Sequence, residues 1–348
     1  MPLGGITIGG GAPVSVQSMT KTHTEDVEAT LDQIRELADI GCEIIRCAVP
    51  NRRAVPALEQ IKASSLLPVV ADIHFSADLA LRALETGVDG VRVNPGTIKD
   101  IERLDDVFAQ AGERGIKVRV GMNSGSVRAR SGLSVSPEAS RHDVAELMVE
   151  DALKACRRAE EAGCANLVVS LKASDVPSTI RAYRMAADRC DYPFHLGVTA
   201  AGPMESSVIK SAVGIGTLLA EGIGDTIRVS ITGPPHEEVR VAYRILESLG
   251  LRRPEGPEII SCPTCGRCEI DLRSLVAEVK DRLRDFNEPI KVAVMGCAVN
   301  GPGEAAECDV GVAGGREFGY IFCKGKKIEK RPAEELTDAL MEQIEKLE

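Results

Sequence analysis

The chain has 348 residues, a formal net charge of −10 and 44% hydrophobic residues, which suits one large barrel or two domains. The negative charge argues against nucleic acid or an anionic membrane as the partner, and 3% aromatic residues with no Trp leave few platforms for stacking bases. Its start has no basic and apolar leader, and no apolar run is long enough to span a bilayer. These features predict a cytoplasmic protein.

Short runs rich in β-branched residues alternate with segments of helical period that often end at glycine. The predicted strands are Val14–Thr20, Glu43–Val49, Pro68–Ile73, Gly90–Asn94, Lys117–Asn123, Leu167–Lys172, Phe194–Thr199 and Thr226–Ile231. Eight strand and helix repeats are typical of a parallel (β/α)8 barrel of TIM type. A doubly wound sheet is the alternative, although no GxGxxG turn follows the first strand. We expect the glycine-rich stretch Ile6–Pro13 to form a hairpin that plugs the barrel floor.

The strand and helix rhythm changes after a polar linker with Pro and Gly, Arg252–Pro257. We therefore predict a barrel domain over residues 1–250 and a smaller α+β domain over residues 257–348. The second domain is expected to contain a cysteine turn, a helix over Glu269–Arg284, a strand at Ile290–Met295, a second cysteine turn, two short strands between residues 309 and 322, and a closing helix from Pro332. Residues 324–327 are expected to form a solvated turn.

Basic side chains stand at the carboxyl ends of successive predicted strands. These ends carry Arg46, Asp72 with His74, Arg92 with Asn94, Arg119 with Asn123, Lys172, His195, and Arg228 with Ser230. Catalytic groups of a barrel lie at this end, so five cations would converge on one mouth. The nearby acids, Asp72 and Asp175, are too few to neutralise them, which favours a polyanionic ligand, most simply a diphosphate. A single arginine of this kind would more often form a loop salt bridge.

The two histidines at these strand ends are weaker signals, because a hydrogen-bonded core histidine is the more common case. Asp72 and Asn123 could equally orient substrate hydroxyls or neighbouring arginines.

Six of the 11 cysteines fall in the last quarter of the chain, in the runs Cys-Pro-Thr-Cys-Gly-Arg-Cys (262–268) and Met-Gly-Cys-Ala-Val-Asn-Gly-Pro-Gly-Glu (295–304) and at two later single positions. Zinc is the first alternative, because Cys-Pro-x-Cys-Gly resembles half of a zinc ribbon. A zinc ribbon needs a second CxxC motif, however, and the second run offers the single Cys297. Three thiolates with a carboxylate would leave one iron of a 4Fe-4S cluster with an exchangeable oxygen ligand, which suits catalysis at the cluster. Cys268 could compete for a corner. The remaining cysteines, Cys42, Cys47, Cys156, Cys164 and Cys190, are expected to pack in the core.

Seven motifs in order resemble the 4-hydroxy-3-methylbut-2-en-1-yl diphosphate synthases of the methylerythritol phosphate route to isoprenoids, in the short two-domain bacterial form. They are Val16–Thr20, Ala71–Phe75, Arg92–Gly96, Ser170–Asp175, Glu221–Thr226, Cys262–Arg267 and Gly296–Glu304. The resemblance implies an iron-sulfur oxidoreductase that opens and dehydrates 2-C-methyl-D-erythritol 2,4-cyclodiphosphate at a 4Fe-4S cluster reduced by ferredoxin or flavodoxin. It also implies a head-to-tail homodimer.

Carried over by position, the resemblance makes Cys262, Cys265, Cys297 and Glu304 the cluster ligands and Cys268 a bystander. It makes Arg46, Arg92, Arg119, Lys172, Arg228 and Ser230 the diphosphate binders, with Asn123 near the reacting carbons. Glu304, Asn123 and Lys172 are thereby the expected catalytic residues. Where the family usually has Glu, this chain has Ala200, whose methyl group cannot deliver a proton.

Two other functions remain open on the residues alone. One is a dihydropteroate-synthase-like barrel transferase, which also binds a diphosphate ester, with a structural zinc module. The other is a non-catalytic iron-sulfur carrier, which would have little use for five strand-end cations.

Overall fold

The computed structural model describes residues 1–131, 139–254, 256–297 and 301–347. The chain divides into two compact units, Met1–Arg252 and Arg253–Glu348.

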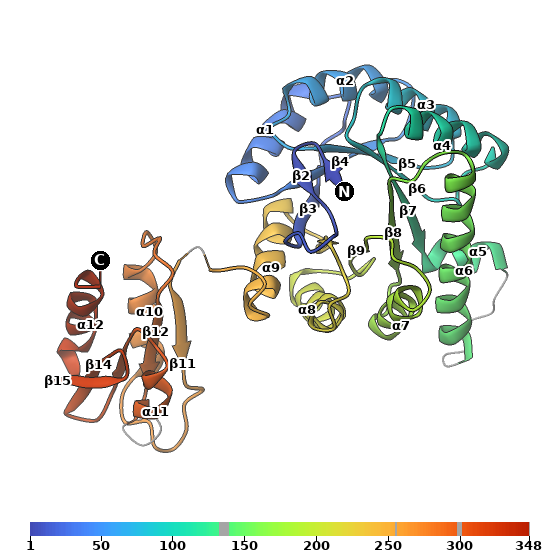
Figure 1. Ribbon diagram of the computed structural model, residues 1–348. Coiled ribbons are helices and arrows are strands. Elements are labelled where there is room, and N and C mark those ends of the chain that lie inside the picture. The colour runs from blue at the N-terminus through green and yellow to red at the C-terminus, as the bar shows by residue number, and fades with distance from the viewer. Residues whose placement is uncertain (132–138, 255, 298–300, 348) are drawn as a thin grey trace. The chain divides into compact units, whose positions relative to one another are not determined.

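The first unit is built around eight parallel strands (Figure 1). They are β3 (Ser15–Met19), β4 (Ile44–Val49), β5 (Val69–Ile73), β6 (Gly90–Val93), β7 (Lys117–Asn123), β8 (Leu167–Lys172), β9 (His195–Leu196) and β10 (Thr226–Ile227). Their order in the sheet is β8-β7-β6-β5-β4-β3-β10-β9, and a parallel bridge between Val169 and Phe194 links the two edges. The predicted (β/α)8 barrel is therefore confirmed.

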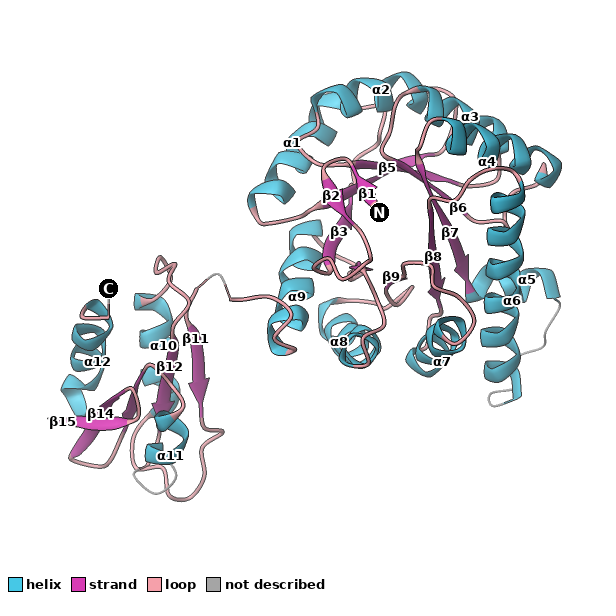
Figure 2. Ribbon diagram, viewed as in Figure 1, coloured by secondary structure: helices cyan, strands magenta, loops and turns pink. Residues whose placement is uncertain are grey.

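Helices surround the strands on the outside of this unit (Figure 2). They are α1 (Val27–Asp39), α2 (Ala54–Ser64), α3 (Ala77–Glu85), α4 (Leu104–Glu113, after the 3-10 turn Ile101–Arg103), α5 (Ser124–Ser131), α6 (Ala139–Glu161), α7 (Val176–Ala187), α8 (Met204–Ala220) and α9 (Pro235–Ser248). Asp26, Ser76 and Asp175 cap α1, α3 and α7 by accepting a backbone N–H of the first turn. The apolar faces of the helices bury against the strands in one continuous core.

A short antiparallel hairpin lies at the amino ends of the barrel strands. It consists of β1 (Pro2–Leu3) and β2 (Ile6–Thr7), and it begins before the predicted range. Leu3 and Ile8 pack on Ile44 and Val70, the apolar residues at the starts of two strands. The hairpin thus covers the barrel floor, and the carboxyl ends of the strands form the other end of the barrel.

Strands β9 and β10 are shorter than the sequence predicts. The backbone N–H of Ile231, inside the predicted eighth strand, donates to the Glu238 carboxylate at 3.2 Å instead of to a neighbouring strand. Thr199, in the predicted seventh strand, donates to the carbonyl of Ala173 beyond the end of β8. Side-chain and loop acceptors therefore replace the sheet ladder at this part of the barrel.

The second unit contains a mixed five-stranded sheet in the order β11-β12-β13-β14-β15. Its elements are β11 (Glu258–Ser261), α10 (Leu272–Arg282), β12 (Lys291–Met295), α11 (Gly301–Ala306), β13 (Val310–Ala313), β14 (Phe318–Cys323), β15 (Lys326–Pro332), the 3-10 turn Ala333–Glu335 and α12 (Leu336–Glu345). The sequence prediction missed β11 and β15. Its turn is confirmed for Lys324 and Gly325, which join β14 to β15 with positive φ angles of 48° and 74°, whereas Lys326 and Lys327 already belong to β15.

Among the described residues, no helix has the length and apolar character needed to cross a bilayer.

Candidate functional site

Five cationic side chains from the barrel strands gather within electrostatic reach of one another. We call this set the cationic crown: Arg46, Arg92, Arg119, Lys172 and Arg228. Arg92, Arg119 and Lys172 are buried, with exposed fractions of 6%, 6% and 8%. The structure brings together all five cations that strand-end reasoning selected. Their mutual repulsion, in a place that water barely reaches, has to be offset by nearby anions.

Asp72, at the end of β5, is one of two buried carboxylates that contact the crown. Its Oδ1 lies 3.3 Å from Nη1 of Arg92, and its Oδ2 lies 3.7 Å from Nε of Arg46 and 3.3 Å from Nε2 of His74. Burial alone would raise the pKa of Asp72, but the Arg46 charge, the His74 hydrogen bond and the Arg92 charge together hold it well below its ordinary value. Asp72 is therefore ionised and orients two arginines.

Glu238, on α9, is the second buried carboxylate and was missed by the sequence analysis. It accepts from Nε of Arg228 at 3.3 Å and from the hydroxyl of Ser18 at 3.2 Å, and it pairs with Lys21 at 3.2 Å. The available signal was a carboxylate in a segment of helical period, next to Val239 and on the side of the helix that also buries Val241 and Ala242. This contact fixes the direction of the Arg228 side chain.

Arg119 spans the barrel interior to Gln17 on β3, a second residue that sequence reasoning missed. Its Nη1 donates to Oε1 of Gln17 at 2.6 Å. Within the described residues, Nε and Nη2 of Arg119 find no hydrogen-bond partner although both are buried. Buried guanidinium donors that remain unsatisfied are costly, so this group calls for an anionic acceptor.

Lys172, the last residue of β8, contacts His195 on the neighbouring strand β9. Its Nζ lies 3.1 Å from Nε2 of His195, which is itself fully buried. Burial, followed by the charges of the neighbouring arginines, holds the pKa of Lys172 well below its ordinary value. The same causes act on Arg46, where burial lowers the pKa to about 10.

Two glycines make room for crown side chains. A Cβ atom on Gly121 would lie 2.6 Å from Nε of Arg92, and one on Gly197 would lie 2.5 Å from Nζ of Lys172 and 2.7 Å from the Arg228 carbonyl oxygen. Real Cβ atoms do not approach so closely, so both positions require glycine for the crown to keep this packing.

The other predicted site residues of the barrel lie at the same strand ends. Asn123 ends β7 and is partly buried, and the carbonyl of Ser230 accepts a hydrogen bond from Ser207 at 2.7 Å. Ala200 is exposed in the loop after β9 with φ of 50°. A positive φ is strained for alanine, and such strain is enriched at functional sites.

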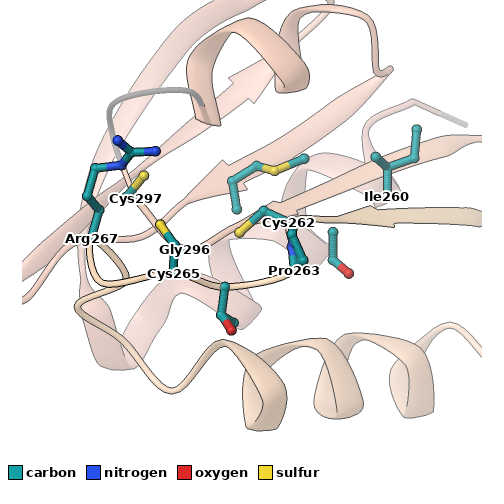
Figure 3. A pocket seen from close by; sticks show the side chains of 10 residues that line it. Ile260, Cys262, Pro263, Cys265, Arg267, Gly296 and Cys297 are labelled. Carbon is teal, nitrogen blue, oxygen red and sulfur yellow. The ribbon is translucent and has the colours of Figure 1, made fainter.

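The second unit holds a separate cysteine-lined cavity of about 380 Å³. Cys262 follows β11, Cys265 follows in the turn, and Cys297 follows β12, so the carboxyl ends of two parallel strands carry the three thiols (Figure 3). The backbone of Thr264 in this turn has φ of 64°. Arg267 also lines the cavity and adds a positive charge beside the thiols.

The three thiols that line the cavity are candidate ligands for a metal group. Among the described residues, no group of three or more His, Cys, Asp or Glu side chains is placed to hold one metal ion. Three thiols around one cavity are the soft donors that a larger iron-sulfur group requires. The predicted fourth ligand, Glu304, belongs to α11, but its side chain lies outside the described residues.

Cys268 is not among the residues that line the cavity, although its sulfur packs against Gly296, which is. Its sulfur lies 3.3 Å from the carbonyl oxygen of Ile270, and a Cβ on Gly296 would lie 2.5 Å from that sulfur. The five early cysteines pack in or against the barrel core as expected, and burial raises the pKa of Cys47 to about 11. An inert core cysteine is thereby distinguished from the thiols that line the cavity.

Comparison with known proteins identifies both units. Residues 1–243 match the GcpE TIM-barrel domain, and residues 258–346 match the GcpE protein C-terminal domain. The chain is 52% identical over 345 residues to 4-hydroxy-3-methylbut-2-en-1-yl diphosphate synthase (flavodoxin) of Geobacter sulfurreducens, covering 99% of this chain and 96% of the relative. It is 48% identical over 346 residues to the protein of the same description from Aquifex aeolicus, covering 99% and 95%.

Two solved structures resemble part of the chain. A dihydropteroate synthase from Coxiella burnetii in complex with pteroic acid matches 70% of this chain and 96% of its own, with a TM-score of 0.51 and 11% identity. One from Stenotrophomonas maltophilia matches 68% and 92%, with a TM-score of 0.50 and 16% identity. At these identities the likeness shows the fold and not the reaction.

Proposed function

The chain belongs to the GcpE family, and from that membership and the two sites above we propose that it is a 4-hydroxy-3-methylbut-2-en-1-yl diphosphate synthase. The reaction is the reductive ring opening of 2-C-methyl-D-erythritol 2,4-cyclodiphosphate with loss of water. Near 50% identity over almost the full length of the curated relatives supports this activity over that of a dihydropteroate synthase or a carrier.

The crown is the proposed binding site for the cyclic diphosphate. The observation that carries this assignment is Arg119, which is buried with two unsatisfied donors inside a set of five cations that contacts two buried carboxylates. Two negatively charged phosphates would offset the excess positive charge of the crown and accept hydrogen bonds from Nε and Nη2 of Arg119. Ser230 would bind a remaining phosphate oxygen. Asn123, which ends β7, would bind the groups attached to the reacting carbons of the substrate.

Cys262, Cys265 and Cys297 are the proposed ligands of a 4Fe-4S cluster, with Glu304 as the fourth, exchangeable ligand. When bound, this group would supply the two electrons of the reaction one at a time from reduced flavodoxin or ferredoxin. The donor named in the descriptions of the relatives is flavodoxin, which favours it for this chain.

The crown also has a proposed role during bond breaking. As the ring carbon–oxygen bond breaks, negative charge builds up on the leaving phosphate oxygen. Fixed donors on Arg228 and Lys172 stabilise that charge without having to reorient, because Glu238 and His195 already hold them. Lys172 is for this reason a catalytic candidate as well as a binder.

We further propose that the enzyme works as a homodimer in which one subunit's crown and its partner's cysteine site serve one substrate molecule. The test is to mix Lys172→Ala chains with Cys297→Ala chains, each inactive alone. Verified mixed dimers should regain part of the wild-type activity. If they remain inactive, the sites are not shared between subunits.

The test of the function itself is anaerobic reconstitution with iron and sulfide followed by turnover of the cyclodiphosphate with a reduced low-potential donor. We expect brown protein that releases 4-hydroxy-3-methylbut-2-enyl diphosphate. Arg119→Met should bind iron and sulfide normally but lose substrate affinity, whereas Cys297→Ala should bind substrate but lose the cluster. Zinc without sulfide in the anaerobically purified protein would contradict the proposal.

A further inference from the structure

Lys172 differs from the other crown cations in its partner. Within the described part of the chain it makes no ion pair, and its recorded hydrogen-bond partner is the neutral ring atom Nε2 of His195 at 3.1 Å. Gly197 lies so close to Nζ that even a methyl group would collide with it. The end of this side chain therefore lies between a glycine and an imidazole, and not against a carboxylate.

His195 is itself fixed by hydrogen bonds from two other elements. Its Nδ1 contacts the hydroxyl of Thr226 on β10, and its carbonyl accepts from Oη of Tyr183 on α7 at 2.5 Å. A hydroxyl can donate or accept, so Thr226 satisfies either tautomer of the ring. The imidazole can consequently face Lys172 with a lone pair or with an N–H while its position stays the same.

The charged groups around this pair come from every element packed against it. They are Arg46 on β4, Asp72 on β5, Arg92 on β6, Arg119 on β7, Arg228 on β10 and Glu238 on α9, with the phenol of Tyr183 on α7 and the imidazole of His74 after β5. Both carboxylates form ion pairs with arginines and not with Lys172. The net charge around Lys172 is therefore positive and disfavours a proton on its amine.

Arginine keeps its proton under all ordinary conditions, whereas a buried lysine releases one readily. Burial and the four guanidinium charges hold the pKa of Lys172 well below its ordinary value, and burial and Lys172 do the same to His195. In the empty crown, Lys172 is thus the cation that releases its proton most readily.

We propose that His195 is a positioning residue that holds Lys172 as a proton acceptor, and that Lys172 takes up one proton from solvent when the doubly negative substrate enters the crown. This inference rests on the proposed function. The two phosphates add negative charge next to Lys172, where cations otherwise predominate. The new ammonium then donates one hydrogen bond to Nε2 of His195 and another to a phosphate oxygen. No covalent bond changes, and the buffer supplies the proton.

The sign of the pH dependence follows from this linkage. Below the pKa that Lys172 has in the empty enzyme, the lysine is already charged and binding takes up no proton. Above it, the complex holds one more proton than the free partners, so affinity falls by about tenfold for each pH unit until the pKa of the complex is reached. The ligand adds no titration of its own, because each phosphate of the cyclic diphosphate has one ester bond and one anhydride bond, and its single remaining acidic oxygen stays ionised.

The experiment is calorimetric titration of the oxidised holoenzyme with the cyclodiphosphate, without an electron donor, in two buffers that differ in ionisation enthalpy. We call the pH range between the pKa of Lys172 in the empty enzyme and its pKa in the complex the uptake window. The wild type should take up about one proton per site inside this window and about none at its acidic end. Lys172→Arg should bind without proton uptake at any pH, and Lys172→Met should bind more weakly, also without uptake. Equal heats in the two buffers for the wild type, or the same uptake in Lys172→Met, would overturn the proposal.

The role of His195 is tested separately. His195→Leu removes the acceptor, so the window should move to lower pH, whereas His195→Gln keeps a carbonyl acceptor and should restore it. Thr226→Val, which leaves the imidazole in place but frees Nδ1, provides a milder variant if His195→Leu does not fold. An unchanged window in all three would remove His195 from the proposal. If the wild type failed to bind the cyclodiphosphate at all, the proposed function would fall first.

Discussion

Oε1 of Gln17 on β3 accepts a hydrogen bond from Nη1 of Arg119 on β7, with 2.6 Å between the two atoms. The amide therefore fixes a guanidinium from the far side of the barrel and leaves two of its donor atoms for a ligand. Neither residue could hold this geometry alone, because the arginine side chain has four rotatable bonds to restrain.

Gln17→Ala should weaken binding of the cyclodiphosphate about tenfold, since a hydrogen bond to a charged group contributes roughly 1.5–3 kcal/mol. The dissociation constant of the oxidised enzyme is the measurement. Gln17→Glu is the matched variant: it keeps the acceptor but adds a negative charge, so it should orient Arg119 while reducing the attraction for phosphate. Wild-type affinity in Gln17→Ala would show that Arg119 is positioned without the amide.

Asp72 predicts how the barrel responds to acid. Its pKa is lower in the folded state than in the unfolded chain, so its stabilising contribution is complete above the unfolded pKa near 4 and is lost as the pH falls toward the folded value. Chemical denaturation of the wild type and Asp72→Asn should therefore differ most above pH 5, with the variant less stable, and should converge in strong acid. A constant difference across the whole range would contradict an ionised Asp72.

Gly197 predicts a packing constraint under Lys172. Gly197→Ala would place a methyl group 2.5 Å from Nζ of Lys172 and 2.7 Å from the Arg228 carbonyl, both of which would have to move. We expect a loss of about 1–3 kcal/mol in the free energy of unfolding and weaker substrate binding.

The matched control is Gly216→Ala on the outer helix α8, where an added Cβ meets no atom within 4 Å. A glycine in a helix interior costs about 0.5–1 kcal/mol relative to alanine, so this change should raise the melting temperature and leave binding unchanged. Equal effects of the two substitutions on binding would show that Gly197 has no special contact with the crown.

Local pattern was enough to predict the barrel and its cations. The bounds predicted for β7 and β8 agree with those observed, because both strands contain two valines, are buried along almost their whole length and end at a polar residue. The same reasoning selected the cations, and Lys172 does end β8. Arg46 and Arg119, however, lie before the ends of β4 and β7, so their predicted place at the strand ends was wrong.

Pairings between distant segments could not be predicted in the same way. Glu238 meets Ser18 across a separation of 220 residues, and Gln17 meets Arg119 across 102. Each pair is set by which strands and helices become neighbours after the barrel closes, and the spacing along the chain carries no trace of it. The early end of β10 has a local origin instead, since the acceptor that replaces the ladder is Glu238 on α9, only seven residues after Ile231.

We expect Cys297 to be a cluster ligand and Cys268 to be a packing residue. Cys297→Ala should lose iron, sulfide and the visible absorption of the reconstituted protein, because it removes one of three thiols around the cavity. Cys268→Ala should keep all three signals, since its sulfur packs against Gly296 and the Ile270 carbonyl. Iron and sulfide analysis decides between them, and a loss in Cys268→Ala equal to that in Cys297→Ala would make Cys268 a ligand.

Ala200 has no acidic group, so we expect proton delivery to limit the turnover rate. The overall reaction releases water and so consumes a proton, and the loop after β9 offers only a methyl group at this exposed position. A positioned carboxylic acid contributes roughly 10²–10⁴-fold to proton transfer, so Ala200→Glu should raise kcat at least about tenfold, most strongly at mildly acidic pH where the acid is protonated.

Ala200→Gln separates the proton from the size of the side chain. It has nearly the same shape and the same positive φ to accommodate, but it has no acidic proton, so its kcat should remain at the wild-type value. A rise in both variants would mean that the longer side chain orders substrate or loop. No rise in either would mean that another group already delivers the proton, and the ammonium that we propose at Lys172 in the substrate complex is then the next candidate to test.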